Sequence, residues 1–225
     1  MQVISGPMGR TKVHYQAPPS HEIAHQMRKF FEWWNNPPKN LDWIIRAAIA
    51  HFWFISIHPF EDGNGRIARA LTDMALAQAE KSSKRFYSLS SQILKNKSKY
   101  YAVLEKVQKC AGDITEWLIW FLSIYRASIK DSEIAIEKSL FIASFYKLHA
   151  TTFLNGRQLK VIKKLLEHLP DDFSGGLTNQ KYVSMTKTSA ESAKRDLKDL
   201  VEKKILLLNE KKGRSTSYRL NKELL

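Results

Sequence analysis

A short polar loop at residues 58–66 carries the side chains of this sequence that are best suited to chemistry. His58 is the only side chain of the loop whose unperturbed pKa lies near neutrality, which makes it the natural general base. Asp62 offers a carboxylate of the kind that Mg²⁺ takes together with phosphate oxygens and water. A base beside such a metal ligand suits the attack of a hydroxyl group on a nucleotide phosphorus.

The second half of the loop predicts a site for an anion. We expect a new helix to open at Arg66, where unpaired backbone N–H groups and the helix dipole attract phosphate. Gly63 and Gly65 let the backbone approach phosphate oxygens, and Asn64 between them can donate an amide hydrogen bond into the same space. Arg66 and Arg69 oppose the helix dipole, a local cost that an anionic ligand between them would offset.

Each of these features has a structural explanation when it is taken alone. A histidine after an apolar helix is often structural, and Asp-Gly-Asn-Gly is often only a turn. Two arginines at helical spacing are usually solvated, and Phe60 is expected to fill the core in either case. The full set of residue types in this order is a far more specific pattern than any one of them.

The run from His58 to Arg69 resembles the signature of the Fic family, His-x-Phe-x-Asp/Glu-Gly-Asn-Gly-Arg-x-x-Arg, at every specified position. The similarity extends from the first residues to about Tyr125. It implies a protein adenylyltransferase that moves AMP from ATP to a Tyr, Thr or Ser hydroxyl of a target protein, with self-modification also expected. By this resemblance His58 deprotonates the hydroxyl, Asp62 binds Mg²⁺, and the phosphates are held by Gly63, Asn64, Gly65, Arg66 and Arg69.

The resemblance implies further contacts outside the loop. The hairpin at residues 1–16 is similar to the family's flap, along which the target segment binds as an added strand. Its second strand would wall the nucleotide site, and a Tyr-containing helix would lie beside the adenine. The residues implied are Val13, His14, Tyr15, Gln16, Tyr100 and Gln108, the last standing where relatives carry Asn. The alternative is that Tyr100 and Tyr101 belong to the core of the bundle.

One element of many relatives has no counterpart here. Their inhibitory helix has the pattern Ser/Thr-x-x-x-Glu, and its glutamate pairs with the arginine that corresponds to Arg69. No Ser or Thr of this sequence has Glu four residues on. We therefore expect a fragment that lacks the usual N-terminal inhibitory domain. Removal of AMP, which needs that glutamate, is disfavoured, and so is phosphate transfer, since that branch of the family has Lys in place of Gly65.

The elements that must position these residues are mainly helical. Apolar spacing predicts a helical bundle over residues 1–150. The resemblance implies that this bundle is of the Fic type, with the flap hairpin at 1–16 and the signature loop and helix start at 58–69. Pro37-Pro38 ends the first helix of this bundle. The remaining expected helices cover residues 41–57, 66–80, 89–95, 99–109, 114–126 and 133–149.

Residues 155–225 predict a small winged helix-turn-helix domain. Helices at 159–168, 179–185 and 189–203 precede two short strands at 206–209 and 217–220, joined by a basic turn. The candidate DNA contacts are Lys194, Arg195, Lys198, Lys211, Lys212 and Arg214. Two alternatives stay open: a docking domain that touches no DNA, and a nucleotide-sensing regulator that acts by binding DNA through this domain.

Composition sets wider limits. The chain has 225 residues, with 36 Lys and Arg against 22 Asp and Glu and a formal charge of +14, which favours polyanionic partners unless these lysines are merely solvated. Cys110 is the single cysteine, which excludes an intrachain disulfide, and we expect it to be buried and inert. The longest apolar stretch, residues 117–125, is too short to span a membrane, and no secretory signal is evident. We expect a cytoplasmic protein without membrane contact, and leave a homodimer open.

Overall fold

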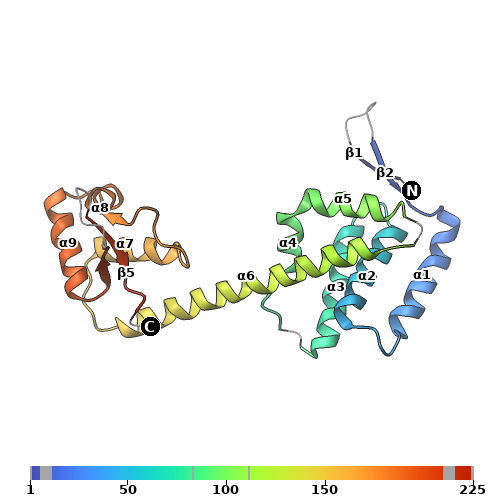
Figure 1. The fold of residues 1–225 in the computed structure, drawn as a ribbon, viewed down its shortest axis with the longest axis horizontal. Coiled ribbons are helices and arrows are strands. Elements are labelled where there is room, and N and C mark those ends of the chain that lie inside the picture. Colours follow the sequence, from blue (N-terminus) through green and yellow to red (C-terminus); the bar gives the residue numbers. More distant parts are fainter. Residues whose placement is uncertain (1, 6–11, 83, 111, 210–215, 224–225) are drawn as a thin grey trace. The chain divides into compact units, whose positions relative to one another are not determined.

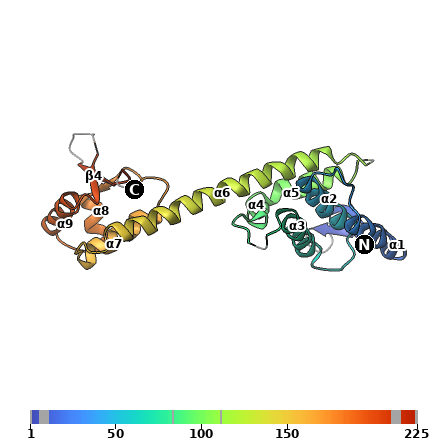
Figure 2. The same ribbon diagram turned by 90° about the horizontal axis from the view of Figure 1, so that it is seen from below.

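The structure is a computed structural model that describes residues 2–5, 12–82, 84–110, 112–209 and 216–223. The chain folds as two compact units, Met1–Ser132 and Glu133–Leu225, each with its own hydrophobic core. Figures 1 and 2 label the helices of both units and, between them, all strands except β3. In the described part of the chain, no helix has the length and hydropathy needed to cross a membrane.

The first unit is a helical bundle with one small hairpin, as the sequence predicts. Strands β1 (Gln2–Ser5) and β2 (Lys12–Gln16) pair antiparallel, and the turn expected at residues 5–9 lies, apart from Ser5, outside the described residues. The helices are α1 (Ser20–Asn35), α2 (Trp43–Ile57), α3 (Asn64–Glu80), α4 (Leu89–Lys95), α5 (Lys97–Val107) and the first part of α6 (Thr115–Leu148).

Helices α2 and α3 form the centre of this unit and lie side by side in both views (Figures 1 and 2). Helix α2 is apolar nearly all round, because other helices pack against several of its faces. Its alanines Ala47, Ala48 and Ala50 are fully buried, and such small side chains allow close approach of neighbouring backbones. Trp117 of α6 donates from Nε1 to the Ala48 carbonyl over 2.9 Å, which ties α6 to α2.

Helix α6 is continuous, and the expectation of two helices over 114–126 and 133–149 is wrong. The intervening residues are polar but include neither Gly nor Pro. The Ser128 hydroxyl donates to Tyr125 O over 2.7 Å, and the Ser132 hydroxyl donates to Ile129 O over 2.8 Å. Because these polar groups find acceptors within the helix, they do not interrupt it.

The division between the units also falls inside α6, after Ser132, rather than near residue 150 as the sequence suggested. The cause is the end of α6, where Phe145 is 2 % exposed and belongs to the core of the second unit. The second half of this helix is therefore part of the C-terminal unit.

The second unit has three further helices and a small sheet. Helices α7 (Gly156–Glu167), α8 (Asn179–Thr186) and α9 (Ala190–Glu202) match the expected order. Strands β4 (Leu206–Leu208) and β5 (Ser217–Leu220) pair antiparallel, and the unexpected short strand β3 (Leu177–Thr178) pairs with the other edge of β5. Its assignment as a winged helix-turn-helix stays a prediction.

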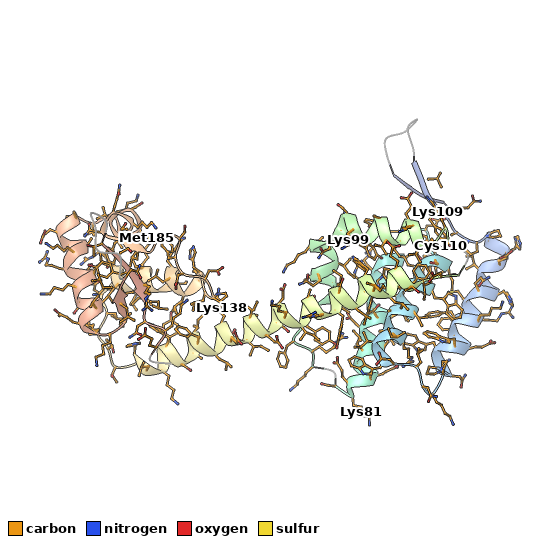
Figure 3. The ribbon with its side chains drawn as sticks, viewed as in Figure 1. Lys81, Lys99, Lys109, Cys110, Lys138 and Met185 are labelled. Carbon is orange, nitrogen blue, oxygen red and sulfur yellow. The ribbon has the colours of Figure 1, made fainter. Side chains whose placement is uncertain are left out.

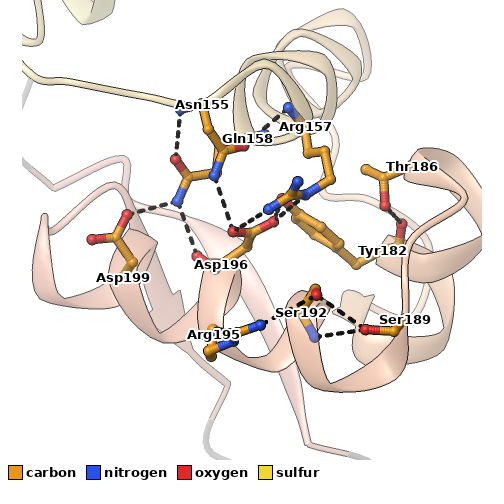
Figure 4. Close-up of polar contacts among 10 residues, drawn as sticks. All are labelled: Asn155, Arg157, Gln158, Tyr182, Thr186, Ser189, Ser192, Arg195, Asp196 and Asp199. Carbon is orange, nitrogen blue, oxygen red and sulfur yellow. Dashed lines mark hydrogen bonds and ion pairs between the residues drawn. The ribbon is translucent and has the colours of Figure 1, made fainter.

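A polar network fixes the three helices of this unit against one another (Figure 4). The buried carboxylate of Asp196 on α9 accepts from Arg157 Nε at 2.8 Å, Asn155 Nδ2 at 3.0 Å and the Tyr182 hydroxyl at 2.9 Å. Burial opposes ionisation, but these donors outweigh it and lower the pKa of Asp196. The network therefore fixes which face of α9 points inward.

Candidate active site

The signature loop joins α2 to α3 through two sharp changes of backbone direction. His58 closes α2 in the left-handed region, with φ 50°, and its N–H donates to Phe54 O over 3.1 Å. Gly63, with φ 87°, is the N-cap of α3, a conformation that glycine adopts without strain. Helix α3 begins at Asn64, two residues before the expected start at Arg66.

Asn64 braces the loop, contrary to the expectation that its amide points into the phosphate space. Its side chain is 3 % exposed. Oδ1 accepts from Phe60 N at 3.1 Å, while Nδ2 donates to Phe60 O at 2.5 Å. Both ends of the amide are thus held by the Phe60 backbone, which orients the side chain toward its own loop. The backbone N–H of Asn64 faces the start of the helix and can serve an anion.

His58 is half-buried and held in the tautomer that a general base requires. Its Nδ1 lies 3.2 Å from Ile55 O, and because a carbonyl oxygen only accepts, Nδ1 carries the proton. The lone pair is then on Nε2, which has no hydrogen bond within the described residues. Burial lowers the pKa of His58, and the bond to the Ile55 carbonyl opposes that shift in part. The neutral, proton-accepting form therefore persists to a lower pH than in an exposed histidine.

The first turn of α3 has free backbone N–H groups, on which the predicted anion site depends. The first N–H to bond back along the helix is that of Ile67, which donates to Gly63 O over 3.0 Å. The N–H groups of Asn64, Gly65 and Arg66 therefore have no partner within the helix. A Cβ on Gly65 would lie 3.4 Å from Arg69 Nη1, so the guanidinium of Arg69 sits close over this turn. Three N–H donors and a cation thus converge at one helix end.

Arg69 has no ion-pair partner among the described residues, whereas Arg66 pairs with Asp62 at 2.7 Å. The Asp62 carboxylate is 89 % exposed and also accepts from Gly63 N at 2.6 Å. No cluster of three or more His, Cys, Asp or Glu side chains suited to a metal occurs in the part of the chain that the structure describes. One exposed carboxylate beside a phosphate site still fits Mg²⁺, which usually keeps several waters and takes its other ligands from phosphate. Such an ion would arrive with the nucleotide and compete with Arg66 for Asp62.

Two of the expected wall residues meet at Ser56, which the sequence reasoning missed. The Tyr15 hydroxyl of β2 donates to Ser56 O over 2.8 Å, and Gln108 Nε2, at the end of α5, donates to Ser56 Oγ over 3.1 Å. Ser56 stands two residues before His58, so the hairpin and α5 are both tied to the turn at His58.

The other wall residues of β2 are described less fully. Val13 is 45 % exposed, and Gln16 is also exposed. His14 belongs to β2, but its side chain lies outside the described residues.

Tyr100 does not line a nucleotide site, so its assignment to the adenine side is corrected. It is 4 % exposed, and its hydroxyl lies 3.1 Å from His51 Nε2. Its ring packs 5.5 Å from that of Trp120. The alternative that Tyr100 belongs to the bundle core is correct, whereas its neighbour Tyr101 is 54 % exposed.

The remaining candidate residues lie apart from the loop in sequence. Lys194, Arg195 and Lys198 are exposed on α9, while Lys211, Lys212 and Arg214 lie outside the described residues. Cys110, expected to be buried, is exposed just after α5 (Figure 3), with Sγ 3.5 Å from Lys106 O. That expectation is wrong because α5 ends at Val107, and the chain after it turns to the surface.

Comparison with known proteins points to one family. The sequence model described as the Fic/DOC family matches residues 3–76. A probable protein adenylyltransferase of Aquifex aeolicus is 29% identical over 104 residues, which cover 46% of this chain and 30% of that protein. The protein adenylyltransferase fic-1 of Caenorhabditis elegans is 38% identical over 58 residues, or 25% of this chain and 11% of that protein. The chain thus matches less than a third of the length of these relatives.

The solved structures include a weaker likeness. The crystal structure of a Fic family protein from Desulfovibrio desulfuricans G20 superposes with a TM-score of 0.48 and 18% identity, covering 96% of this chain and 59% of that one.

Proposed function

We propose, since residues 3–76 belong to the Fic/DOC family, that this chain transfers AMP from Mg-ATP to a hydroxyl group of a protein. The proposal rests above all on His58, whose unprotonated Nε2 stands one short loop away from the free N–H groups of α3. A base and an anion site joined by one loop are what attack of a hydroxyl on a phosphorus requires. The relatives named above are called protein adenylyltransferases.

The reaction would run as a single displacement. The target oxygen attacks the α-phosphorus of ATP, the bond from that phosphorus to the oxygen shared with the β-phosphate breaks, and diphosphate leaves. His58 Nε2 takes the hydroxyl proton as the new bond forms. The N–H groups of Asn64, Gly65 and Arg66 would hold phosphate oxygens, and Arg69, which has no ion-pair partner in the described residues, would hold the terminal phosphate.

A magnesium ion would be held by Asp62 and by phosphate oxygens, where it supplies charge neutralisation of the diphosphate leaving group. For this, the ion pair between Arg66 and Asp62 would have to open, so that the Asp62 carboxylate becomes free to bind the ion. Because Arg66 is itself exposed, its guanidinium can move to the phosphates in the same step.

The target would lie along the hairpin, with a Tyr, Thr or Ser hydroxyl presented to His58. Strand β2 pairs with β1 on one edge only in the sheet as described, so its other edge has backbone groups for an added strand. The bond from Tyr15 to Ser56 O would set the distance between that edge and the base. A hydroxyl of this chain near the hairpin would be modified in the same way when no target is present.

Isotope position tests the reaction type. The protein is incubated with Mg²⁺ and ATP labelled at the α-phosphate or, separately, at the γ-phosphate, with and without cell lysate. AMP transfer predicts label on protein from the α-position only. Label from the γ-position would indicate phosphate transfer, and no label from either would contradict the proposal.

A second function is supported by α9, and we propose that the C-terminal unit binds duplex DNA. Asp196 faces inward through its contacts with α7 and α8, so Lys194, Arg195 and Lys198 are left on the outer face of the helix. Helices α8 and α9 are separated by a short turn at Lys187–Ser189, in which Lys187 adopts φ 56°. A helix presented in this way, with cations outward, is suited to phosphates and base edges of a groove.

A matched pair of variants tests DNA binding. Replacement of Lys194, Arg195 and Lys198 by Ala should weaken binding to a labelled duplex at least ~10-fold and reduce the slope of log affinity against log salt by about 3, if each contacts one phosphate. The control replaces Lys160, Lys163 and Lys164, three exposed lysines of α7, and removes the same charge. Equal losses in both variants would mean non-specific attraction, and no binding by the parent would favour a docking domain.

A further inference from the structure

A buried polar chain lies between α2, α3 and α5, and the mechanism above gives it no role. His51 of α2 is fully buried, and its Nδ1 lies 2.9 Å from Thr72 Oγ1 of α3. Its Nε2 lies 3.1 Å from the Tyr100 hydroxyl of α5. The imidazole is enclosed by the rings of Trp117 at 5.2 Å and Phe121 at 6.5 Å. Polar groups in such a position need an explanation, because burying them is costly unless they are paired.

The direction of every hydrogen bond in this chain can be assigned. The Thr72 hydroxyl donates to Ala68 O over 2.8 Å, so towards His51 it can only accept. His51 Nδ1 therefore carries the proton, and Nε2 accepts from Tyr100. Burial, with a smaller contribution from the charge of Arg69, lowers the pKa of His51 to about 3, which keeps the ring neutral. The side chains of Thr72, His51 and Tyr100 are therefore uncharged, and each of their hydrogen bonds has a fixed direction.

The hydrogen-bonded chain of Thr72, His51 and Tyr100 connects α2 and α3, the two helices that carry the proposed base and anion site. His51 precedes His58 by seven residues, two turns of α2, and Thr72 follows Arg69 by three residues on α3. The buried stripe of α3 runs through Asn64, Ala68 and Thr72 at four-residue spacing. Hydrogen bonds fix both ends of the stripe: Asn64 makes two to the Phe60 backbone, and Thr72 makes one to His51 of α2.

Apolar packing alone does not fix the register between these helices as firmly. The hydrophobic effect is non-directional, and the buried alanines of α2 have small side chains that interlock little with a neighbouring helix. A hydrogen bond weakens steeply when its angle and length change, so the bond between His51 and Thr72 resists sliding and rotation of α3.

We propose that His51 and Thr72 are positioning residues, which set the place of Arg69 and of the α3 N-terminus relative to His58. The expected effect on catalysis rests on the proposed function. The placement of α3 against α2 by these two residues does not depend on that function. Both residues act through Arg69 and touch no substrate.

Three variants test the inference. Thr72→Val keeps the shape of the side chain and removes the hydroxyl, while Thr72→Ser keeps the hydroxyl. We expect Thr72→Val to lower kcat/KM for AMP transfer at least ~10-fold, since misplacement by about 1 Å costs up to ~10²-fold. Thr72→Ser should stay within ~3-fold of the parent. Tyr100→Phe removes the hydroxyl that contacts His51 Nε2. It should also lower kcat/KM, by less than Thr72→Val does.

A cycle with Arg69 separates positioning from general damage. In an Arg69→Ala background, Thr72→Val should reduce Mg-ATP affinity by less than ~2-fold, because the group that it positions is gone. If the two losses multiply instead, Thr72 does not act through Arg69 and the inference is wrong. Should Thr72→Val fail to fold, the same cycle with Tyr100→Phe decides the question.

Amide hydrogen exchange distinguishes failure of this inference from failure of the proposed function. Loss of the bond should speed exchange at the first bonded amide of α3, Ile67 N–H, in Thr72→Val but not in Thr72→Ser, whether or not ATP binds. Faster exchange in a protein that transfers nothing would leave the positioning role and remove the proposed reaction. Unchanged exchange and activity in both variants would overturn the positioning role.

Discussion

Replacing Gly65 by Ala should raise stability and lower activity at once. Gly65 is the second residue of α3, and its φ lies outside the left-handed region. Alanine there gains up to about 1 kcal/mol of helix propensity and loses nothing to backbone strain. Its Cβ would lie 3.4 Å from Arg69 Nη1, at the near limit of an ordinary contact, so it would fill the space between the turn and the guanidinium.

The two effects have different sizes and different readouts. A gain of about 1 kcal/mol corresponds to a rise in Tm of about 2–4 °C for a chain of this length. A Cβ in that space would keep phosphate oxygens from approaching the backbone of the turn and Arg69 together, and we expect kcat/KM to fall about tenfold, or about 1.4 kcal/mol of transition-state stabilisation. Thermal unfolding and initial transfer rates with α-labelled ATP measure both quantities on the same preparation.

Gly156→Ala is the matched control. Gly156 is the first residue of α7, and nothing lies within 4 Å of a Cβ placed there. This variant should gain stability in the C-terminal unit and keep the parent's activity. An active Gly65→Ala variant, or one that loses activity only because it unfolds, would refute the assignment of this turn and of Arg69 to the phosphates.

Four more expectations follow from single side chains. Because burial lowers the pKa of His58, the acid limb of the kcat/KM profile should have its midpoint below 6.5, and a midpoint at or above 6.5 would contradict that environment. Asp62→Asn should raise the Mg²⁺ concentration for half-maximal activity ~10-fold, and equal dependence in variant and parent would remove Asp62 as a ligand. Phe145→Ala should cost the C-terminal unit about 3–5 kcal/mol, as seen in its denaturant unfolding, because Phe145 is 2 % exposed in that core; a change below about 1 kcal/mol would place it elsewhere. Cys110, being exposed, should react with a thiol reagent in the native protein nearly as fast as in the unfolded chain, and protection would mean that it is buried.

The sequence predicted the local order of the loop, because its residues are contiguous: His58 at the end of one helix, and the next helix opening at Arg66, two residues later than in the structure. It did not predict that Phe60, expected in the core, is 48% exposed. It could not predict which way Asn64 points, since an amide can serve a ligand or its own loop equally well. The direction depends on whether Phe60 backbone groups come within reach, and only the folded loop decides that.

Residues brought in from distant segments were harder to predict. Tyr100 and Tyr101 must face different sides of α5, but periodicity does not say which side is buried, and packing against Trp120 decides it. Ser56 and Thr72 carried no signal of their own, because a lone hydroxyl in a helix is common. Their roles depend on partners 41 or more residues away for Ser56 and 21 residues away for Thr72.

The central claim, that His58 is the base for AMP transfer, is tested most directly by intact mass. The parent and His58→Ala are each incubated with Mg-ATP and cell lysate, after calorimetry has shown that both bind Mg-ATP. If His58 is the base, the parent should yield protein carrying one added AMP, and the folded variant at least ~10²-fold less. AMP transfer at the parental rate by folded His58→Ala would contradict it.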